Sequence, residues 1–590
     1  MRFRRSSKRI PSPLLVLVFL TLTRPLHAQN AQPVVRDLVL SGNHSVTADR
    51  LRPLLSTRAT SYFSWLPWVG TQRLDSAKMR ADLLRLRGYY RDHGFFEAEV
   101  DTVLDRSENG RVRVSFIVQE GPATEVHHAV ITGLVLPDGL KKSLTVQPGR
   151  RLSRPDLEAD QLLLLDTVRD SGYAFATVAV QSHVDQALRR ATVTYRVEPG
   201  RRYRFGSARV EGNERVSADA IQRGLTFRPS QIFSSSKLRQ SRRQLYLSGA
   251  FRSVVLDVPD SLITAEEVAV VVKVSERSPR TVRVGAGYDT ESQFQARLAL
   301  THRSAFGGGQ QLTVSASGSA IENEASLSLR QPYVFGSKNW ISLRSFVTRQ
   351  ERQEFSQIEL GGNLLFERNI RTRTTFFFDT SAGLIDFKAD SAFTEFAFGF
   401  RNDRRDDFLD PSDGLLVNLT VKEKGLLFRS DREFLEFAGE GRFYWRLPLG
   451  LVLATKVLGG ALFDLSDSGE IPNIERYFGG GLSSVRGWGF EELAPRDEGG
   501  AVVGGKSRVE GSVELRAKMG RYLGAVAFVD AGNVDAEFDA FNPRLLKWTV
   551  GAGLRYLSPV GPIRVDLARR MSEDAFVSRH QVHLSLGQAF

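Results

Sequence analysis

A phosphate-binding loop is the first chemistry that the residue spacing suggests. Residues Gly500-Ala-Val-Val-Gly-Gly-Lys-Ser507 match the G-x4-G-K-S pattern, in which backbone amides and a lysine bind phosphate. That chemistry requires a strand before the loop and a helix after it, because the helix N-terminus helps to hold the phosphate. Here an alternating strand pattern begins at Arg508. We therefore interpret the match as a chance feature of a glycine-rich loop and expect no nucleotide cofactor.

A histidine and a serine near the C-terminus form a second candidate pair. His583 and Ser585 share one face of a predicted strand, where a hydrolase could use them together. No G-x-S-x-G nucleophile elbow occurs in the chain, and no acidic partner for a triad is identifiable. We therefore expect that the protein is not an enzyme.

Metal and nucleic-acid sites have little support. The chain has no cysteine, which excludes thiolate ligands and disulfides. The nine histidines are scattered, and the adjacent His127 and His128 are predicted to lie on opposite faces of a strand. The basic residues form no dense run of the kind that binds nucleic acid. We expect no metal, no cofactor and no nucleic-acid partner.

The loop segment Ser484-Val-Arg-Gly-Trp488 is a stronger candidate for a functional site. It lies in a glycine-rich stretch between Ile471 and Ser507. Arg486 precedes a glycine and an aromatic residue, which allow tight folding, and the carboxylates of Glu514 and Asp530 lie on the predicted strands that follow. An arginine that leaves water is stabilised by charge-assisted hydrogen bonds to such carboxylates. The alternative is an arginine on a solvated loop.

The elements that carry these residues alternate with period 2. From Thr281 to Phe590 helical periodicity disappears; in Arg508–Arg516, for example, Val509, Val513 and Leu515 share one face and charged side chains lie on the other. A soluble sandwich also alternates, but this run is long for one sandwich. It predicts a closed transmembrane antiparallel β-barrel of roughly 16 strands with a wet interior.

Three related segments precede the barrel. Each begins with a strand and a glycine turn, continues through helices to a second glycine turn, and ends with an alternating strand. This order predicts three small α+β domains, at residues 29–121, 122–200 and 201–278, followed by the barrel at residues 279–590. An open sheet edge in such a domain can accept an additional strand. The alternative is three packing modules with no binding role.

An export signal is predicted at residues 1–28. A basic start is followed by the apolar stretch Leu14–Leu20, and Ala28 supplies a small residue for cleavage. The apolar stretch is too short to span a bilayer as a helix. Cleavage would lower the net charge from +13 to about +7, so much of the basicity belongs to the targeting signal.

These features resemble the BamA/TamA outer-membrane assembly superfamily, and TamA most closely by the three arm repeats, which are similar to POTRA domains. Val485-Arg-Gly-Trp488 resembles the family's VRG-aromatic motif on the sixth extracellular loop, with tryptophan where phenylalanine or tyrosine is usual. Leu557–Pro562 and Asp406–Pro411 resemble family turns. In such proteins the loop folds into the lumen, where its arginine meets the barrel wall. The resemblance assigns this lock to Val485, Arg486, Gly487, Trp488, Glu514, Phe528 and Asp530, and a C-terminal targeting signal to Phe590.

The resemblance implies a factor that assists insertion of barrel proteins or autotransporters into the bacterial outer membrane, with residues 29–278 in the periplasm. Its partners would be unfolded clients, membrane lipid and a TamB-like protein anchored in the inner membrane. Client strands would enter at a lateral seam, for which glycine-weakened packing favours Val282, Val284, Gly285, Gly287, Leu584 and Leu586. The alternatives are a polypeptide channel of the two-partner-secretion type and a BamA-like core insertase.

Overall fold

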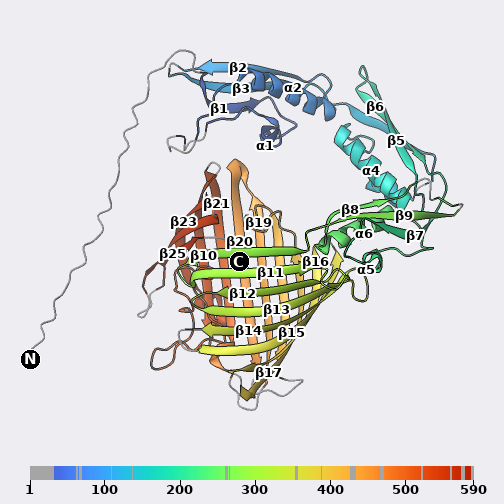
Figure 1. Ribbon diagram of the computed structural model, residues 1–590. Helices are drawn as coiled ribbons and strands as arrows, with labels where there is room; N and C mark the ends of the chain where they lie inside the picture. Colours follow the sequence, from blue (N-terminus) through green and yellow to red (C-terminus); the bar gives the residue numbers. More distant parts are fainter. Residues whose placement is uncertain are drawn as a thin grey trace, which may run out of the picture. The chain divides into compact units, whose positions relative to one another are not determined.

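Three copies of one β-α-α-β-β unit precede a barrel of strands (Figure 1). The computed structural model describes residues 32–590 except 61–63, 65–69, 108, 136, 260–262, 265, 353–355, 372, 387, 426–432, 466–470, 520–521, 559–560, 573–577 and 587–590. The predicted signal peptide at residues 1–28 and the terminal Phe590 lie outside the described residues. No helix in the described part is long and apolar enough to cross a membrane.

Each unit forms its own three-stranded sheet, with strand orders β1-β3-β2, β4-β6-β5 and β7-β9-β8. The first contains β1 (Val34–Ser41), α1 (Ala48–Leu51), the 3-10 turn η1 (Arg52–Leu54), α2 (Ser76–Asp92), β2 (Glu99–Arg106) and β3 (Arg111–Gln119). The second contains β4 (Glu125–Thr132), α3 (Asp138–Ser143), α4 (Arg154–Asp170), β5 (Thr177–Asp185) and β6 (Arg190–Glu198). The third contains β7 (Arg204–Glu211), α5 (Ala218–Arg223), α6 (Ser235–Leu247), β8 (Phe251–Asp257) and β9 (Glu267–Glu276).

A glycine at the equivalent position follows the first strand of every unit. Gly42, Gly133 and Gly212 have φ values of +76°, +92° and +81°. A Cβ atom at these positions would lie 1.9–2.3 Å from the carbonyl oxygen of Val118, Val197 or Val274. Only glycine therefore permits this left-handed turn against the neighbouring strand.

A buried polar side chain fixes the helix pair in each unit. In the second unit Asp160 of α4 accepts hydrogen bonds from the backbone amides of Thr145 and Val146, both at 2.8 Å. Asp82 does the same for Ser56 and Thr57 in the first unit. In the third unit the Ser241 hydroxyl accepts from the Thr226 amide at 2.8 Å. No sequence pattern marks this position in advance, but its equivalence in the three units supports an internal repeat.

The predicted orientation of the two adjacent histidines was wrong. A register shift between Val126 and His128 marks a bulge in β4, which breaks the alternation. Both imidazoles are exposed, and their ring centres lie 4.1 Å apart. The neighbouring His128 lowers the pKa of His127.

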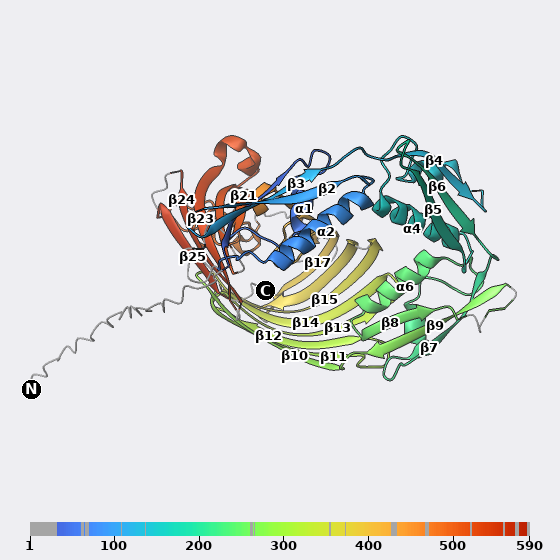
Figure 2. The same cartoon turned by 90° about the horizontal axis from the view of Figure 1, so that it is seen from above.

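Sixteen antiparallel strands close the barrel (Figures 1 and 2). They are β10 (Arg280–Asp289), β11 (Gln293–Arg303), β12 (Gln311–Gly318), β13 (Glu322–Pro332), β14 (Asn339–Glu351), β15 (Ser356–Arg371), β16 (Thr374–Ile385), β17 (Lys388–Asp403), β18 (Gly414–Lys424), β19 (Phe434–Arg446), β20 (Leu451–Asp464), β21 (Ser507–Met519), β22 (Leu523–Asp535), β23 (Lys547–Ser558), β24 (Gly561–Arg570) and β25 (His580–Leu586). Short 3-10 turns lie between some of them: η3 (Pro448–Gly450), η4 (Asn473–Glu475), η5 (Asp539–Phe541) and η6 (Pro543–Leu545).

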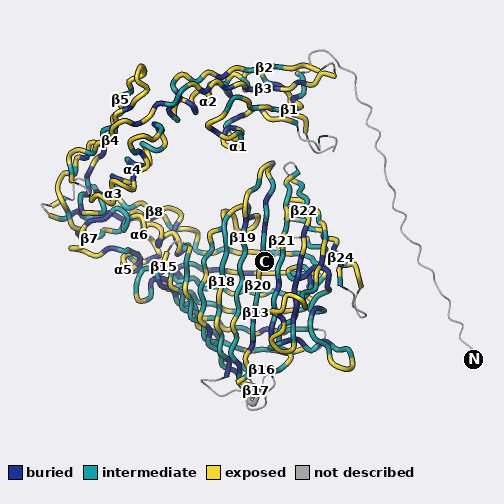
Figure 3. Tube along the Cα trace, turned by 180° about the vertical axis from the view of Figure 1, so that it is seen from behind, coloured by how far each residue is buried: buried dark blue, intermediate teal, exposed yellow. Residues whose placement is uncertain are grey.

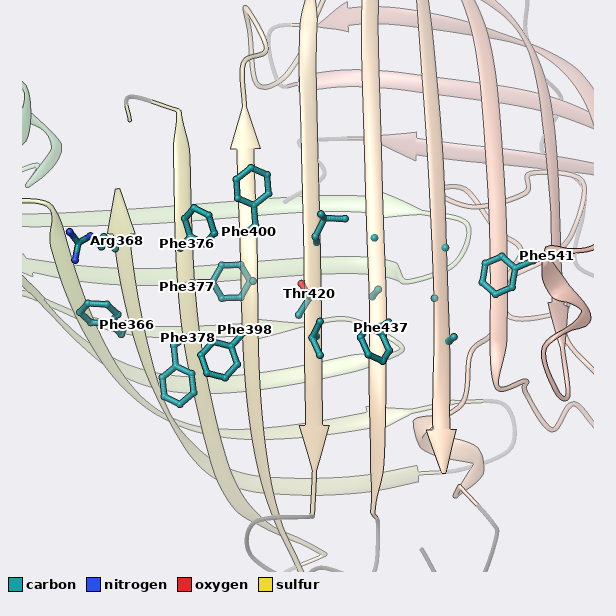
Figure 4. Close-up of a pocket in the computed structure, with 18 residues that line it drawn as sticks. Phe366, Arg368, Phe376, Phe377, Phe378, Phe398, Phe400, Thr420, Phe437 and Phe541 are labelled. Atoms are coloured by element: carbon teal, nitrogen blue, oxygen red, sulfur yellow. The ribbon is translucent and has the colours of Figure 1, made fainter. Parts of the chain in front are cut away.

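The two faces of the barrel wall differ in chemistry. Ion pairs join strands on the inner face: Arg330 of β13 reaches across β14 to Glu367 of β15 at 2.8 Å, and Lys422 and Glu436 join the neighbouring strands β18 and β19 at 2.7 Å. Apolar side chains on the opposite face remain exposed, and exposure alternates along the strands (Figure 3). Phe376, Phe378, Phe398, Phe400 and Phe437 gather on this outer face (Figure 4). The wall is therefore apolar toward lipid and polar toward the lumen, as a transmembrane barrel requires.

One turn of the barrel enters the core of the third unit. Tyr333 follows β13, is 6% exposed and packs in the cluster that contains Ile221 and Leu245. Its hydroxyl donates a hydrogen bond to the Gln244 carbonyl oxygen at 3.1 Å. The Gln311 side chain also donates to the Ser248 carbonyl at 2.5 Å. These residues belong to one compact unit, so the third repeat and the barrel share packing.

Candidate functional site

Loop 6, residues 465–506 between β20 and β21, carries the predicted arginine. Paired backbone segments shape its described part: Tyr477 bridges Gly505, Gly479 bridges Leu493, and Arg496 bridges Val502. Strand β21 starts at Ser507, directly after the sequence that matches a phosphate loop. The helix that phosphate binding by this motif requires is therefore replaced by a strand.

Arg486 lies at the barrel wall and is only 2% exposed. Its Nε and Nη2 atoms donate to the two carboxylate oxygens of Asp530, each at 2.7 Å, and Nη1 donates to Glu514 Oε1 at 2.7 Å. The guanidinium carbon lies 3.4 Å from the ring centre of Phe528. The strands β21 and β22 thus hold a planar cation by a bidentate ion pair, a second carboxylate and an aromatic face.

The residues beside Arg486 also pack closely against the barrel wall. Val485 and Trp488 are buried at 0% and 1% exposure. The Trp488 ring lies 4.5 Å from Arg570 Cζ and 4.7 Å from Lys547 Nζ. A Cβ atom on Gly487 would lie 2.5 Å from Thr549 Cγ2, so this close approach requires glycine. The structure therefore brings together all seven residues that the sequence analysis assigned to the lock.

Three further residues were missed. Asp566 lies 3.5 Å from Arg486 Nη1 and also accepts from Arg555 Nη1 at 2.5 Å. The Ser512 hydroxyl donates to Asp530 Oδ1 at 2.7 Å. The buried His583 bonds to the Arg486 carbonyl through Nε2 at 2.6 Å. Strand parity places Ser512 and Asp566 on polar faces, but only the fold shows that those faces meet loop 6.

The predicted seam residues divide into two groups. Gly287, Leu584 and Leu586 lie where β10 meets β25: Tyr288 pairs with Leu586, and the Thr290 amide donates to the Leu584 carbonyl at 3.0 Å. Val282, Val284 and Gly285 pair with β11 and have no partner on β25 among the described residues. Val282 and Val284 are 62% and 79% exposed, which fits a lipid-facing position.

Among the described residues, the seam has fewer strand pairs than any other junction of the barrel. β10 and β25 pair at two positions, whereas the other neighbouring strands pair at seven to thirteen within the described part of the chain.

Comparison with known proteins decides the family. Residues 305–590 match the Omp85 superfamily domain. Residues 33–121, 125–200 and 203–277 match POTRA, described as the surface antigen variable number repeat. This chain belongs to the Omp85 superfamily. Its barrel accordingly lies in the outer membrane, and its POTRA repeats lie in the periplasm.

Proteins similar to this Omp85 chain include two outer membrane protein assembly factors named BamA. That of Nitratidesulfovibrio vulgaris is 24% identical over 94% of this chain and 73% of its own length. That of Neisseria meningitidis serogroup B is 23% identical over 94% of this chain and 78% of its own length. The crystal structure of Haemophilus ducreyi BamA lacking POTRA domains 1–3 aligns with a TM-score of 0.60 at 18% identity, covering 78% of this chain and 99% of that one. This structural likeness supports the fold.

Proposed function

We propose that this Omp85 protein assists the insertion of barrel proteins or autotransporters into the outer membrane. The observation that carries the proposal is the β10–β25 junction, where the first and last strands close the barrel and pair at Tyr288–Leu586 and Asp289–Ser585. An incoming client must form new strand pairs in lipid, where unpaired backbone groups cost several kcal/mol each. This junction, when it opens, offers the client a template of backbone donors and acceptors.

The POTRA repeats supply the first contact in this proposal. The strands β2, β5 and β8 form one edge of their respective sheets, and no other described strand covers that edge. An unfolded client can add a strand there through backbone hydrogen bonds, which do not depend on its side chains. The proposed steps are non-covalent and use no cofactor. A TamB-like protein anchored in the inner membrane would bring clients to the arm.

Reconstitution tests the proposal. The full chain in liposomes, supplied with a urea-denatured outer-membrane barrel, should increase the yield of folded client, measured as the heat-modifiable band on a gel. Liposomes that contain an unrelated porin are the control. Equal yields in the two preparations would reject the insertion function.

The same liposomes separate insertion from secretion. A two-partner-secretion-type channel would carry an unfolded polypeptide into the lumen of the vesicle, where external protease cannot reach it. It would also give single-channel conductance steps that respond to that polypeptide. We expect the client to be folded in the bilayer instead. Depletion in cells then identifies which barrels leave the outer membrane, which distinguishes a general BamA-like role from a TamA-like one.

A further inference from the structure

We infer that loop 6 clasps the extracellular end of the seam, with Glu291 on the side of the first strand and His583 on the last strand holding residues 482–486 of the loop between them. The inference deepens the proposed function and rests on it, since it treats the β10–β25 junction as a gate. The clasp would make release of the loop a condition for opening the gate.

Glu291 anchors the loop to the first strand. It follows β10 directly, and the Asp289 carboxylate fixes the turn by accepting from the amides of Glu291 and Ser292 at 2.8 and 2.6 Å. The Glu291 carboxylate accepts a hydrogen bond from the Leu482 amide. The Glu291 side chain is 14% exposed, and this burial raises its pKa.

The last two strands bind the same segment from the other side. Arg564 of β24 donates through Nη2 to the Leu482 carbonyl at 3.4 Å. His583 of β25 is 3% exposed, and its Nε2 lies 2.6 Å from the Arg486 carbonyl oxygen. A carbonyl only accepts hydrogen bonds, so Nε2 must carry the proton. The peptide groups of Leu482 and Arg486 thereby link strands on both sides of the seam.

The two anchors also face each other. His583 Nδ1 lies 3.7 Å from Glu291 Oε1, across the junction of first and last strand. The charged groups around this histidine are Glu291, Asp566, Arg564 and the Arg486 guanidinium. Loop 6 makes a third contact just after β14, where Arg352 forms an ion pair with Glu491 of the loop at 2.5 Å. A cavity of about 460 Å³ lies beside the clasp, lined by residues that include Glu291, Arg352, Phe490 and His583.

The described backbone pairing of β10 with β25 lies next to the clasp. Only Tyr288 and Asp289 pair with β25 in the described residues, and both lie at the end of β10 nearest Glu291. Side-chain contacts to loop 6 therefore add to the backbone pairing at this end of the seam. Separation of β10 from β25 would have to break the Glu291–Leu482 bond or the bonds that Arg564 and His583 make to the loop.

Cysteine chemistry tests the clasp, because the natural chain has no cysteine. The pair Tyr288→Cys with Leu586→Cys reports closure of the seam in full-length protein reconstituted in liposomes. We expect Glu291→Ala or His583→Ala to increase the maleimide labelling rate of this pair about fivefold, the effect of a lost hydrogen bond on an opening equilibrium. The controls Glu322→Ala and His580→Ala change an exposed carboxylate at the start of β13 and an exposed histidine on the same strand as His583. Unchanged labelling in the Glu291 and His583 variants, with normal heat-modifiability, would overturn the clasp.

A second pair remains informative if those variants fail to fold. Glu291→Cys with Leu482→Cys should form a disulfide on mild oxidation, and failure to form it would also overturn the clasp. With the disulfide formed, client insertion should stop and should resume after reduction. If the disulfide forms and slows labelling at the seam but insertion continues, the clasp stands and the proposed function is wrong.

Discussion

Arg486 shows at the scale of a single residue how loop 6 is held. The guanidinium is buried and forms a bidentate ion pair with Asp530. Glu514 and Phe528 also contact it. Burial of an ion costs several kcal/mol unless its hydrogen bonds are replaced. Here each nitrogen of the guanidinium has a partner, and Ser512 adds another at 3.2 Å. The charge therefore specifies one position of the loop.

Arg486→Ala should release loop 6 and destabilise the barrel. Loss of one member of a buried ion pair costs about 3–5 kcal/mol, because the remaining carboxylates are left uncompensated. Arg486→Lys should also be defective, since an ammonium group cannot form the bidentate contact. The melting temperature of the heat-modifiable band and protease cleavage within residues 471–506 measure both effects.

A double substitution tests the interaction itself. Arg486→Ala combined with Asp530→Asn should cost less than the sum of the single changes, because the pair has already been broken. Additive losses, or a resistant loop in Arg486→Ala, would contradict the lock and support a solvated arginine.

At the scale of the element, each POTRA repeat depends on one helix pinned to its neighbouring loop. Asp160 of α4 is 1% exposed and accepts two backbone amides and the Tyr195 hydroxyl at 3.3 Å. Burial and this carboxylate raise the pKa of Tyr195 above its ordinary range. The phenol is therefore kept neutral and acts as a donor.

Asp160→Ala should loosen the second repeat selectively. Each buried amide left without an acceptor costs about 1–3 kcal/mol. Hydrogen exchange of residues 144–198 in the full chain should accelerate, while exchange in the barrel stays unchanged. Glu158→Ala, on the exposed face of the same helix, is the matched control and should cost less than about 1 kcal/mol. Equal protection in the two variants would rule out the pinning role.

The last strand carries a separate element-scale prediction. β25 ends at Leu586 in the described residues, and Phe590 lies beyond it. Deletion of Phe590 should impair delivery to the membrane more than the finished barrel, because it removes the hydrophobic residue of the predicted targeting signal. Fractionation should show periplasmic accumulation and degradation. Normal outer-membrane levels of the deletion variant would remove the reason to call this residue a signal.

At the scale of the whole molecule, the third POTRA repeat and the barrel share a core. Tyr333 has a φ of +65° and still places its ring among buried residues of the repeat. Positive φ is unfavourable for a bulky residue, so the packing must offset this strain. The repeat is thereby coupled to the barrel by more than the chain connection at residues 277–279.

Tyr333→Ala should uncouple the two parts. Removal of a buried aromatic side chain costs about 3–5 kcal/mol and leaves a cavity in the repeat. Limited proteolysis of the full chain should then cut within residues 204–276 more readily. Phe335→Ala changes an aromatic residue that is 90% exposed in the same turn, and should leave the pattern as in the wild type. If both variants are cut alike, the shared core has no role in stability.

The sequence by itself determined the strands, the three repeats and most of the lock. Alternation in Arg508–Arg516 is local, because the side-chain direction in a strand follows from position alone. Parity also placed Glu514 on the polar face of its strand and Phe528 on the same face as Asp530. The resemblance then connected these residues to Arg486. The role of these residues in function stays a prediction, tested by the variants above.

Only the tertiary structure decided which distant groups meet. Asp566 and His583 lie 80 and 97 residues from Arg486, and periodicity carries no information on contacts of that separation. The parity of His583 was visible, but it suggested a pair with Ser585 rather than a bond to loop 6. Tyr333 sits in a turn, where no repeating pattern marks a residue for burial. Closure of the barrel and insertion of loop 6 bring these groups together, because both depend on long-range packing rather than on local conformation.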